Sequence, residues 1–145
     1  MSIKSISFFV ILSFILSACT IETKPIDFGN DDCDYCKMTI SDTRYGAELL
    51  TKKGRDYKFD DLHCMKGFLN DEIVAEDQIH SLWIVDFSNP EQLIKAETSF
   101  LLHNDELKSP MGSNIAAFGN EEDLNKYYSE YSGKILTWKE FFNSN

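Results

Sequence analysis

Residues 56–69, DYKFDDLHCMKGFL, join a short strand to an amphipathic helix and decide the fold. The first four residues follow the turn signal Lys53-Gly54, which predicts that they pair as a hairpin with residues 45–51. Asp60 or Asp61 then supplies an N-cap, and the apolar residues beyond it recur at three- and four-residue spacing. The stretch therefore predicts a β-hairpin that runs directly into a helix.

The same order recurs later in the chain. Residues 115–118 are an apolar strand that ends in Phe, as residues 56–59 do, and the acids of residues 121–123 then open a second amphipathic helix. Neither strand–strand–helix unit is large enough to bury its apolar face alone. We therefore predict an α+β fold in which two small similar strand–strand–helix units pack into one compact domain, with Phe59 and Phe118 in equivalent positions.

Further elements complete the predicted domain, which spans residues 33–145 with halves of about 33–78 and 79–145. Three other runs have the composition of strands, and a short helix is predicted near the C-terminus. The strands are expected at residues 81–87, 93–94 and 98–102, and the helix at residues 137–142.

The N-terminus has the pattern of an exported lipoprotein. Lys4 precedes an apolar run of residues 6–16 that is too short to span a bilayer comfortably, which predicts a signal peptide over residues 1–18. The run ends in Leu-Ser-Ala-Cys, which matches the bacterial lipobox with Cys19 as the lipidated residue. We expect residues 19–32 to form a flexible tether. We also expect the protein to be lipid-anchored at the cell membrane or outer membrane, facing the periplasm or exterior.

Composition excludes some functions and gives no support to others. The chain has 14 basic and 24 acidic residues, a net charge of −10, and such a surface repels the phosphates of nucleic acid. No nucleophile–base arrangement surrounds the three histidines, and no glycine-rich phosphate loop is present in the sequence. We therefore predict a protein that is not an enzyme and does not bind nucleic acid.

Three cysteines remain once Cys19 is assigned to the lipid, an odd number for an exported protein. Cys33-x-x-Cys36 brings two sulfurs together, as metal sites, disulfides and redox dithiols all require, and Met38 follows closely. The residues after the motif favour a strand, whereas a thioredoxin-type dithiol opens a helix. Metal binding, a plain disulfide and redox chemistry all remain open from this motif alone.

Two further residues, Cys64 and Met111, are candidate sulfur ligands. Cys64 lies in the predicted first helical turn, where exposed amides stabilise a thiolate, although a buried structural Cys explains it equally well. Met111 lies in a Ser-Pro-Met-Gly turn, where a side chain gains little burial, and this favours a ligand role. Thioethers select soft ions such as Cu(I), whereas structural zinc takes Cys and His. The combination of cysteines with methionines therefore favours Cu(I) over zinc.

The ordered series of motifs resembles the NosL family of nitrous oxide reductase accessory lipoproteins. The resemblance covers nearly the whole chain after the signal peptide. The residues that carry it are Cys19, Cys33-x-x-Cys36-x-Met38-x-Ile40, Tyr45-Gly46-Ala47, Phe59-Asp60-Asp61-x-x-Cys64-Met65, Val85-Asp86-Phe87, Ala96, Ser109-Pro110-Met111-Gly112 and Ala116-Ala117-Phe118.

This resemblance implies a two-halved α+β protein that binds one Cu(I) through sulfur and delivers copper to the catalytic copper–sulfide centre of nitrous oxide reductase. It implies Met111 and one cysteine of the Cys33/Cys36 pair as ligands, with Cys36 favoured and Met38 a further candidate. Many family members lack a Cys at the position of Cys64, which is here either a third ligand or a structural thiol. NosL-like proteins also occur apart from nitrous oxide reductase, so the client is either that enzyme or another exported copper enzyme.

The sequence thus predicts a membrane-anchored, exported Cu(I) chaperone. Two alternatives use the same cysteines. One is a zinc-stabilised structural or interaction domain that uses Cys33, Cys36 and Cys64, either with or without His63. The other is a thiol–disulfide oxidoreductase that uses Cys33 and Cys36.

Overall fold

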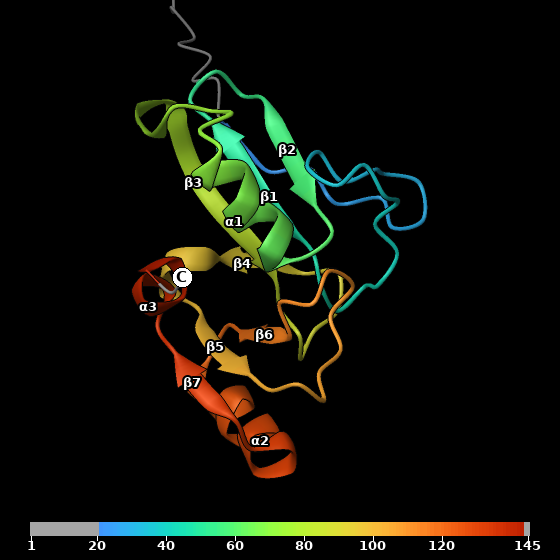
Figure 1. The fold of residues 1–145 in the computed structure, drawn as a ribbon, viewed down its shortest axis with the longest axis vertical. Coiled ribbons are helices and arrows are strands. Elements are labelled where there is room, and N and C mark those ends of the chain that lie inside the picture. Colours follow the sequence, from blue (N-terminus) through green and yellow to red (C-terminus); the bar gives the residue numbers. More distant parts are fainter. Residues whose placement is uncertain (1–20, 144–145) are drawn as a thin grey trace, which may run out of the picture.

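A computed structural model describes residues 21–143, which form two antiparallel sheets with helices packed against them (Figure 1). The first sheet has the order β2-β1-β3-β4. Its strands are β1 (Ala47–Thr51), β2 (Asp56–Phe59), β3 (Ile79–Val85) and β4 (Leu93–Lys95), and helix α1 (Leu62–Asn70) follows β2. A short 3₁₀ helix, η1 (Glu76–Gln78), leads into β3.

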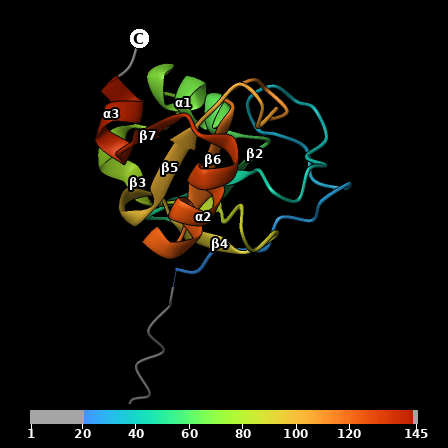
Figure 2. The ribbon, with the colours of Figure 1, turned by 90° about the horizontal axis from the view of Figure 1, so that it is seen from below.

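The second sheet has the order β6-β5-β7. It consists of β5 (Phe100–His103), β6 (Ile115–Phe118) and β7 (Lys134–Leu136), with helix α2 (Glu121–Tyr131) between β6 and β7. A second 3₁₀ helix, η2 (Ala96–Thr98), joins the sheets, and the short helix α3 (Trp138–Asn143) packs beside it. Figure 2 shows α2 over one face of this second sheet and α3 beyond the end of β7.

The two units are alike, as the sequence predicts. In each one a hairpin leads into a helix, and the strand after the helix pairs with the first strand of the hairpin, giving the orders β2-β1-β3 and β6-β5-β7. Phe59 and Phe118 each end the second strand and are fully buried. Each packs on an aromatic residue nine positions later in the following helix, Phe59 on Phe68 at 5.1 Å and Phe118 on Tyr127 at 5.2 Å between ring centroids.

The second sheet has a core on both faces, and this joins the two units into one domain. Leu101 and Ala117 pack into the cluster that also holds the buried residues of α1 and the first sheet. Their neighbours Leu102 and Ala116 point to the other side and pack beneath α2. Because successive strand residues point to opposite faces, a fully apolar strand such as β6 fits between two such layers. The compact α+β fold is thus confirmed.

Two features differ in detail from the sequence prediction. The strand expected at residues 81–87 begins at Ile79 and pairs with β1, so β3 and β4 extend the first sheet and the second sheet begins only at β5. The strand β7 was not predicted, because three residues between a Gly and a short helix carry too little periodicity.

In the described part of the chain, every helix falls short of the length and apolarity that crossing a bilayer requires.

Part of the segment for which the sequence predicts a tether packs on the domain. Ile26 inserts its side chain into the main core, and the amine of Lys58 binds both the Pro25 carbonyl and the Asp31 carboxylate. The backbone N–H of Lys24 donates to Glu48, whose burial raises the pKa of its carboxyl to about 7. From Lys24 onwards the chain is therefore part of the fold. The signal peptide and Cys19 lie outside the described residues.

Candidate metal centre

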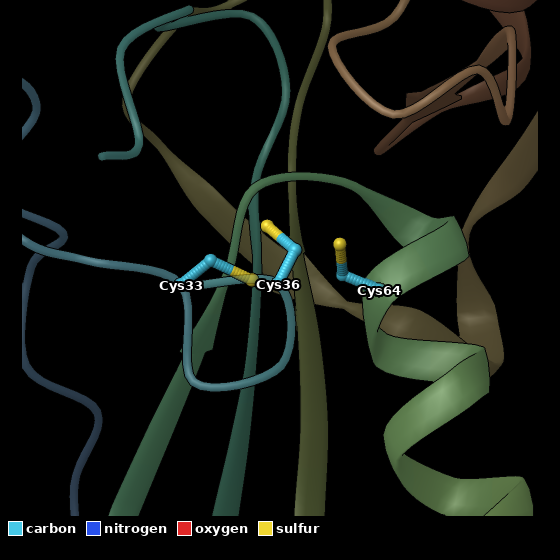
Figure 3. Close-up of side chains that lie close together, drawn as sticks. All are labelled: Cys33, Cys36 and Cys64. Atoms are coloured by element: carbon cyan, nitrogen blue, oxygen red, sulfur yellow. The ribbon is translucent and has the colours of Figure 1, made fainter. Parts of the chain in front are cut away.

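Three cysteine sulfurs from two separate segments meet at one point. The Sγ atoms of Cys33, Cys36 and Cys64 all lie within 4.8 Å of one another, and none of the three cysteines is in a disulfide. Cys33 and Cys36 come from one loop and Cys64 from the adjoining first turn of α1 (Figure 3). Cys33 and Cys64 are fully buried, whereas Cys36 is partly exposed, so solvent reaches the cluster on the side of Cys36.

Backbone hydrogen bonds shape the loop that carries the first two cysteines. The Cys33 N–H donates to the Met38 carbonyl, and the Lys37 N–H donates to the Cys33 carbonyl, which closes a tight turn around the motif. Lys37 adopts a positive φ of 64° at the end of this turn. These bonds fold the C-x-x-C segment into a compact loop without a helix, unlike the helix-opening arrangement of a thioredoxin-type dithiol.

Asp34 attaches this loop to β2. The Asp34 N–H donates to the Lys58 carbonyl, and the Lys58 N–H donates back to the Asp34 carboxylate, both at 2.8 Å. Lys58 lies next to Phe59 at the end of β2, only a few residues before Cys64 in α1. The attachment therefore brings the C-x-x-C loop to the place where the helix begins.

Tyr35 holds the other side of the loop against α1. Its hydroxyl donates to the Asp71 carboxylate at 3.0 Å, and its ring lies directly over Gly67. A Cβ atom at Gly67 would come within 2.5 Å of the ring, so only glycine leaves room for this contact. A lone glycine inside a helical pattern often has a packing reason, and this was the one sequence signal for Gly67.

A single buried carboxylate connects the helix of Cys64 to the loop of Met111. One oxygen of Asp61, the N-cap of α1, accepts hydrogen bonds from the backbone N–H groups of His63 and Cys64. Its other oxygen accepts from the Ser109 hydroxyl at 2.7 Å and from the N–H groups of Met111 and Ser113, both at 3.2 Å. The sequence indicated Asp61 only as a possible cap; its contacts with a loop about 50 residues away depend on the tertiary fold.

The candidate methionines have different surroundings. Met111 is partly buried and packs against the core cluster that contains Cys33 and Cys64. Met38 is 54% exposed, although it follows Cys36 closely in the loop. Of these two thioethers, only Met111 packs against the core cluster that contains Cys33 and Cys64.

The thiols are electrostatically unequal. The pKa of Cys33 is lowered to about 5, chiefly by a hydrogen bond from the Cys64 thiol and further by bonds to backbone groups of Cys36, Asp60 and Tyr35, although burial opposes the shift. The pKa of Cys64 is raised, because its thiol donates to Cys33 and because it is buried. Burial also raises the pKa of Cys36. These interactions make Cys33 the most acidic of the three thiols.

The neighbouring Asp60 adds to the negative character of the site. It is only 3% exposed, and its Oδ1 atom has no hydrogen-bond partner among the described residues. Burial, together with the charges of Cys33 and Asp61, raises the pKa of this carboxyl to about 6. A site of this kind favours a bound cation.

Three sulfurs at these separations match the size of a metal ion. A metal about 2.3 Å from three coplanar thiolates holds the sulfurs about 4.0 Å apart. The three sulfurs here all lie within 4.8 Å of one another, so small movements suffice to bind such an ion. His63 is exposed and does not join the group, so the Cys₃His set of the zinc alternative is not assembled among the described residues. Three free thiols that share one point on a small α+β domain define a candidate site for a soft metal ion.

Comparison with known proteins agrees with this class of site. The sequence model of the NosL family matches residues 25–144, and the chain belongs to the NosL family. The copper-binding lipoprotein NosL of Stutzerimonas stutzeri is 25% identical over 146 residues, which cover 90% of this chain and 76% of that protein. The crystal structure of the copper chaperone NosL from Shewanella denitrificans has the same fold, with a TM-score of 0.71 at 22% identity over 87% of this chain and 99% of that one.

Proposed function

We propose that this protein is an exported, lipid-anchored carrier of Cu(I), without catalytic activity, that delivers copper to nitrous oxide reductase or another exported copper enzyme. The observation that carries the proposal is the group of three free cysteine sulfurs within 4.8 Å of one another. The copper-binding lipoprotein and the copper chaperone among its relatives support the choice of metal. Soft thiolate donors select Cu(I) over harder ions.

We assign Cys33, Cys36 and Cys64 as the thiol ligands, with Met111 as a neutral thioether donor beside them. The partly exposed Cys36 leaves one side of the group accessible. A carrier needs such access, because a ligand of the client must reach the metal before the metal leaves the carrier. A structural zinc site, by contrast, is closed by four ligands. The donor set therefore suits transfer of Cu(I) better than permanent binding of zinc.

Replacing Met111 with leucine is expected to weaken Cu(I) binding about tenfold, which corresponds to about 1.4 kcal/mol. Leucine keeps the apolar packing but removes the thioether, and the loss is smaller than for a thiolate because a thioether carries no charge. Anaerobic competition with a chromophoric Cu(I) chelator measures the change. The matched control is Met38→Leu, which alters an exposed thioether in the cysteine loop and should leave the affinity unchanged.

The opposite ranking of Cu(I) affinities in the two methionine variants would contradict Met111 as the thioether ligand. If Met38→Leu weakens binding and Met111→Leu does not, the thioether ligand comes from the cysteine loop. If neither substitution has an effect, the copper is held by thiols alone. Thermal unfolding of both apo variants shows that the affinities refer to folded protein.

Replacing Cys19 with serine is expected to abolish lipidation and release the domain from the membrane, because the thioether to lipid forms on that sulfur. The folded domain should keep its Cu(I) affinity, since the packed structure from Lys24 onwards holds all of the proposed ligands. Membrane fractionation with and without detergent measures the change. A variant that still partitions with detergent like the parent would overturn the lipid-anchor proposal.

A further inference from the structure

Strand β3 is longer than its outer neighbour, and this leaves part of the first sheet with an open edge. β4 pairs only with Trp83, Ile84 and Val85 of β3. The preceding residues, Ile79–Leu82, have β1 on one side. On the other side no strand pairs with them among the described residues, and η2, which follows β4, contacts β3 there. Figure 1 shows this first half of β3 at the margin of the sheet. Open strand edges offer backbone donors and acceptors to another extended chain.

A cavity of about 770 Å³ lies along this edge. All four residues Ile79, His80, Ser81 and Leu82 line it. Because neighbouring side chains of a strand point to opposite faces, four consecutive lining residues mean that the cavity borders the edge of the strand and not one face. A volume of this size is within the usual range of about 300–1,000 Å³ for ligand-binding cavities.

The cavity is lined by partly buried apolar side chains and by exposed acidic ones. Leu69 at the end of α1 and Trp138 and Phe142 of α3 supply apolar surface. The charged side chains are Glu72, Glu76 and Glu97, and no Lys or Arg of residues 21–143 lines the cavity. All three glutamates are exposed.

We infer that this edge is a docking site for an extended segment of a partner protein in which apolar and basic residues alternate. The segment would add a strand beside the unpaired part of Ile79–Leu82, with apolar side chains towards Trp138 and Phe142 and basic ones towards the glutamates. Strand addition gives affinity through the backbone, and the side-chain pockets give specificity. A second copy of this chain is a poor occupant, because pairing the two edges would bring their acidic rims together.

This inference rests on the sheet edge and does not depend on copper binding. Cys64 lies in the first turn of α1 and Leu69 near its end, so the cavity is separated from the cysteines by about 7.5 Å along the helix axis. A partner held at the edge would leave the exposed side of Cys36 free.

Amide-resolved NMR titration of the apo protein tests the inference directly. The probe is a synthetic peptide of alternating valine and lysine, and the matched control is a peptide of alternating valine and glutamate. We expect the lysine peptide to bind with a submillimolar dissociation constant and to shift the amides of Ile79–Leu82 most strongly, with little effect from the glutamate peptide. Two further versions, N-methylated on odd or on even backbone positions, should differ, because only one set of amides donates to the strand edge.

Charge-reversed variants test whether the glutamates that line the cavity contribute to binding of the lysine peptide. The double substitution Glu76→Lys and Glu97→Lys should weaken binding of the lysine peptide at least about tenfold, whereas Glu130→Lys, on the exposed surface of α2, should not. Absence of binding at millimolar peptide, shifts centred elsewhere, or equal effects of the two charge-reversed proteins would overturn the proposal. Equal binding of both N-methylated peptides, or the same amide shifts with spermidine, would show a groove for apolar or cationic groups and not a strand-addition site.

Discussion

Replacing Phe118 with alanine is expected to lower the free energy of unfolding by about 3–5 kcal/mol. The side chain is fully buried at the end of β6, where it stacks on Tyr127 of α2 and meets Phe87 at 6.0 Å between ring centroids. Its removal leaves a cavity between the second sheet and its helix, and neighbouring aromatic rings are too rigid to fill it. Chemical denaturation monitored by tryptophan fluorescence measures the loss.

Tyr128→Ala provides the matched control in the same unit. This neighbouring aromatic side chain is 42% exposed and has no ring contact among the described residues, so its loss should cost no more than about 1 kcal/mol. If Phe118→Ala were as mild as the control, α2 would not be packed on β6 as described. The two-unit architecture also predicts that Phe59→Ala is as costly as Phe118→Ala, because the two rings have equivalent positions.

Replacing Cys36 or Cys64 with serine is expected to weaken Cu(I) binding more than about 100-fold. Losing a residue that merely supports a metal ligand costs about 10–100-fold, and losing a thiolate ligand should cost more. Cys36→Ser is the safer test of the site, because Cys36 is partly exposed and contributes less to the core than the buried Cys64. Anaerobic chelator competition measures both variants, with thermal unfolding of the apo forms as the control for folding.

The pattern among the cysteine variants separates the alternatives. A disulfide between Cys33 and Cys36 with no metal role would leave Cu(I) affinity unchanged in Cys33→Ser and Cys36→Ser. A thiol–disulfide oxidoreductase would show turnover of a dithiol substrate that both substitutions abolish. Retention of full affinity in Cys64→Ser alone would make Cys64 a structural thiol and reduce the site to the C-x-x-C loop with Met111.

The local elements could be predicted from the sequence because their signals are local. The hairpin and helix of residues 56–69 and their later repeat follow from a turn, an acidic cap and apolar spacing, and the structure confirms them. The packing of Ile26 and Lys24 on the sheet was not predicted, because a polar stretch with little periodicity resembles a tether. Only the tertiary fold shows that Lys58 and Glu48 attach this stretch.

The candidate site was predictable in its residue types but not in its construction. The C-x-x-C motif, Cys64 and Met111 could be identified as soft donors, yet nothing in their spacing shows which of them meet. The reciprocal hydrogen bonds of Asp34 with Lys58 and the five hydrogen bonds accepted by Asp61 make these connections. The Asp34–Lys58 bonds and the three bonds that Asp61 accepts from the loop of Met111 join residues far apart in sequence, so they become visible only in the folded structure. The other two bonds to Asp61 are a local helix cap.

X-ray absorption spectroscopy at the copper edge of the anaerobic Cu(I) complex tests the central claim most directly. The protein is loaded with one equivalent of Cu(I) in the presence of excess zinc, so that metal preference and donor set are read from one sample. We expect copper to be retained and its first coordination shell to contain only sulfur, from the three cysteines and Met111. A shell with nitrogen from a histidine, or replacement of the copper by zinc, would contradict the proposed Cu(I) carrier.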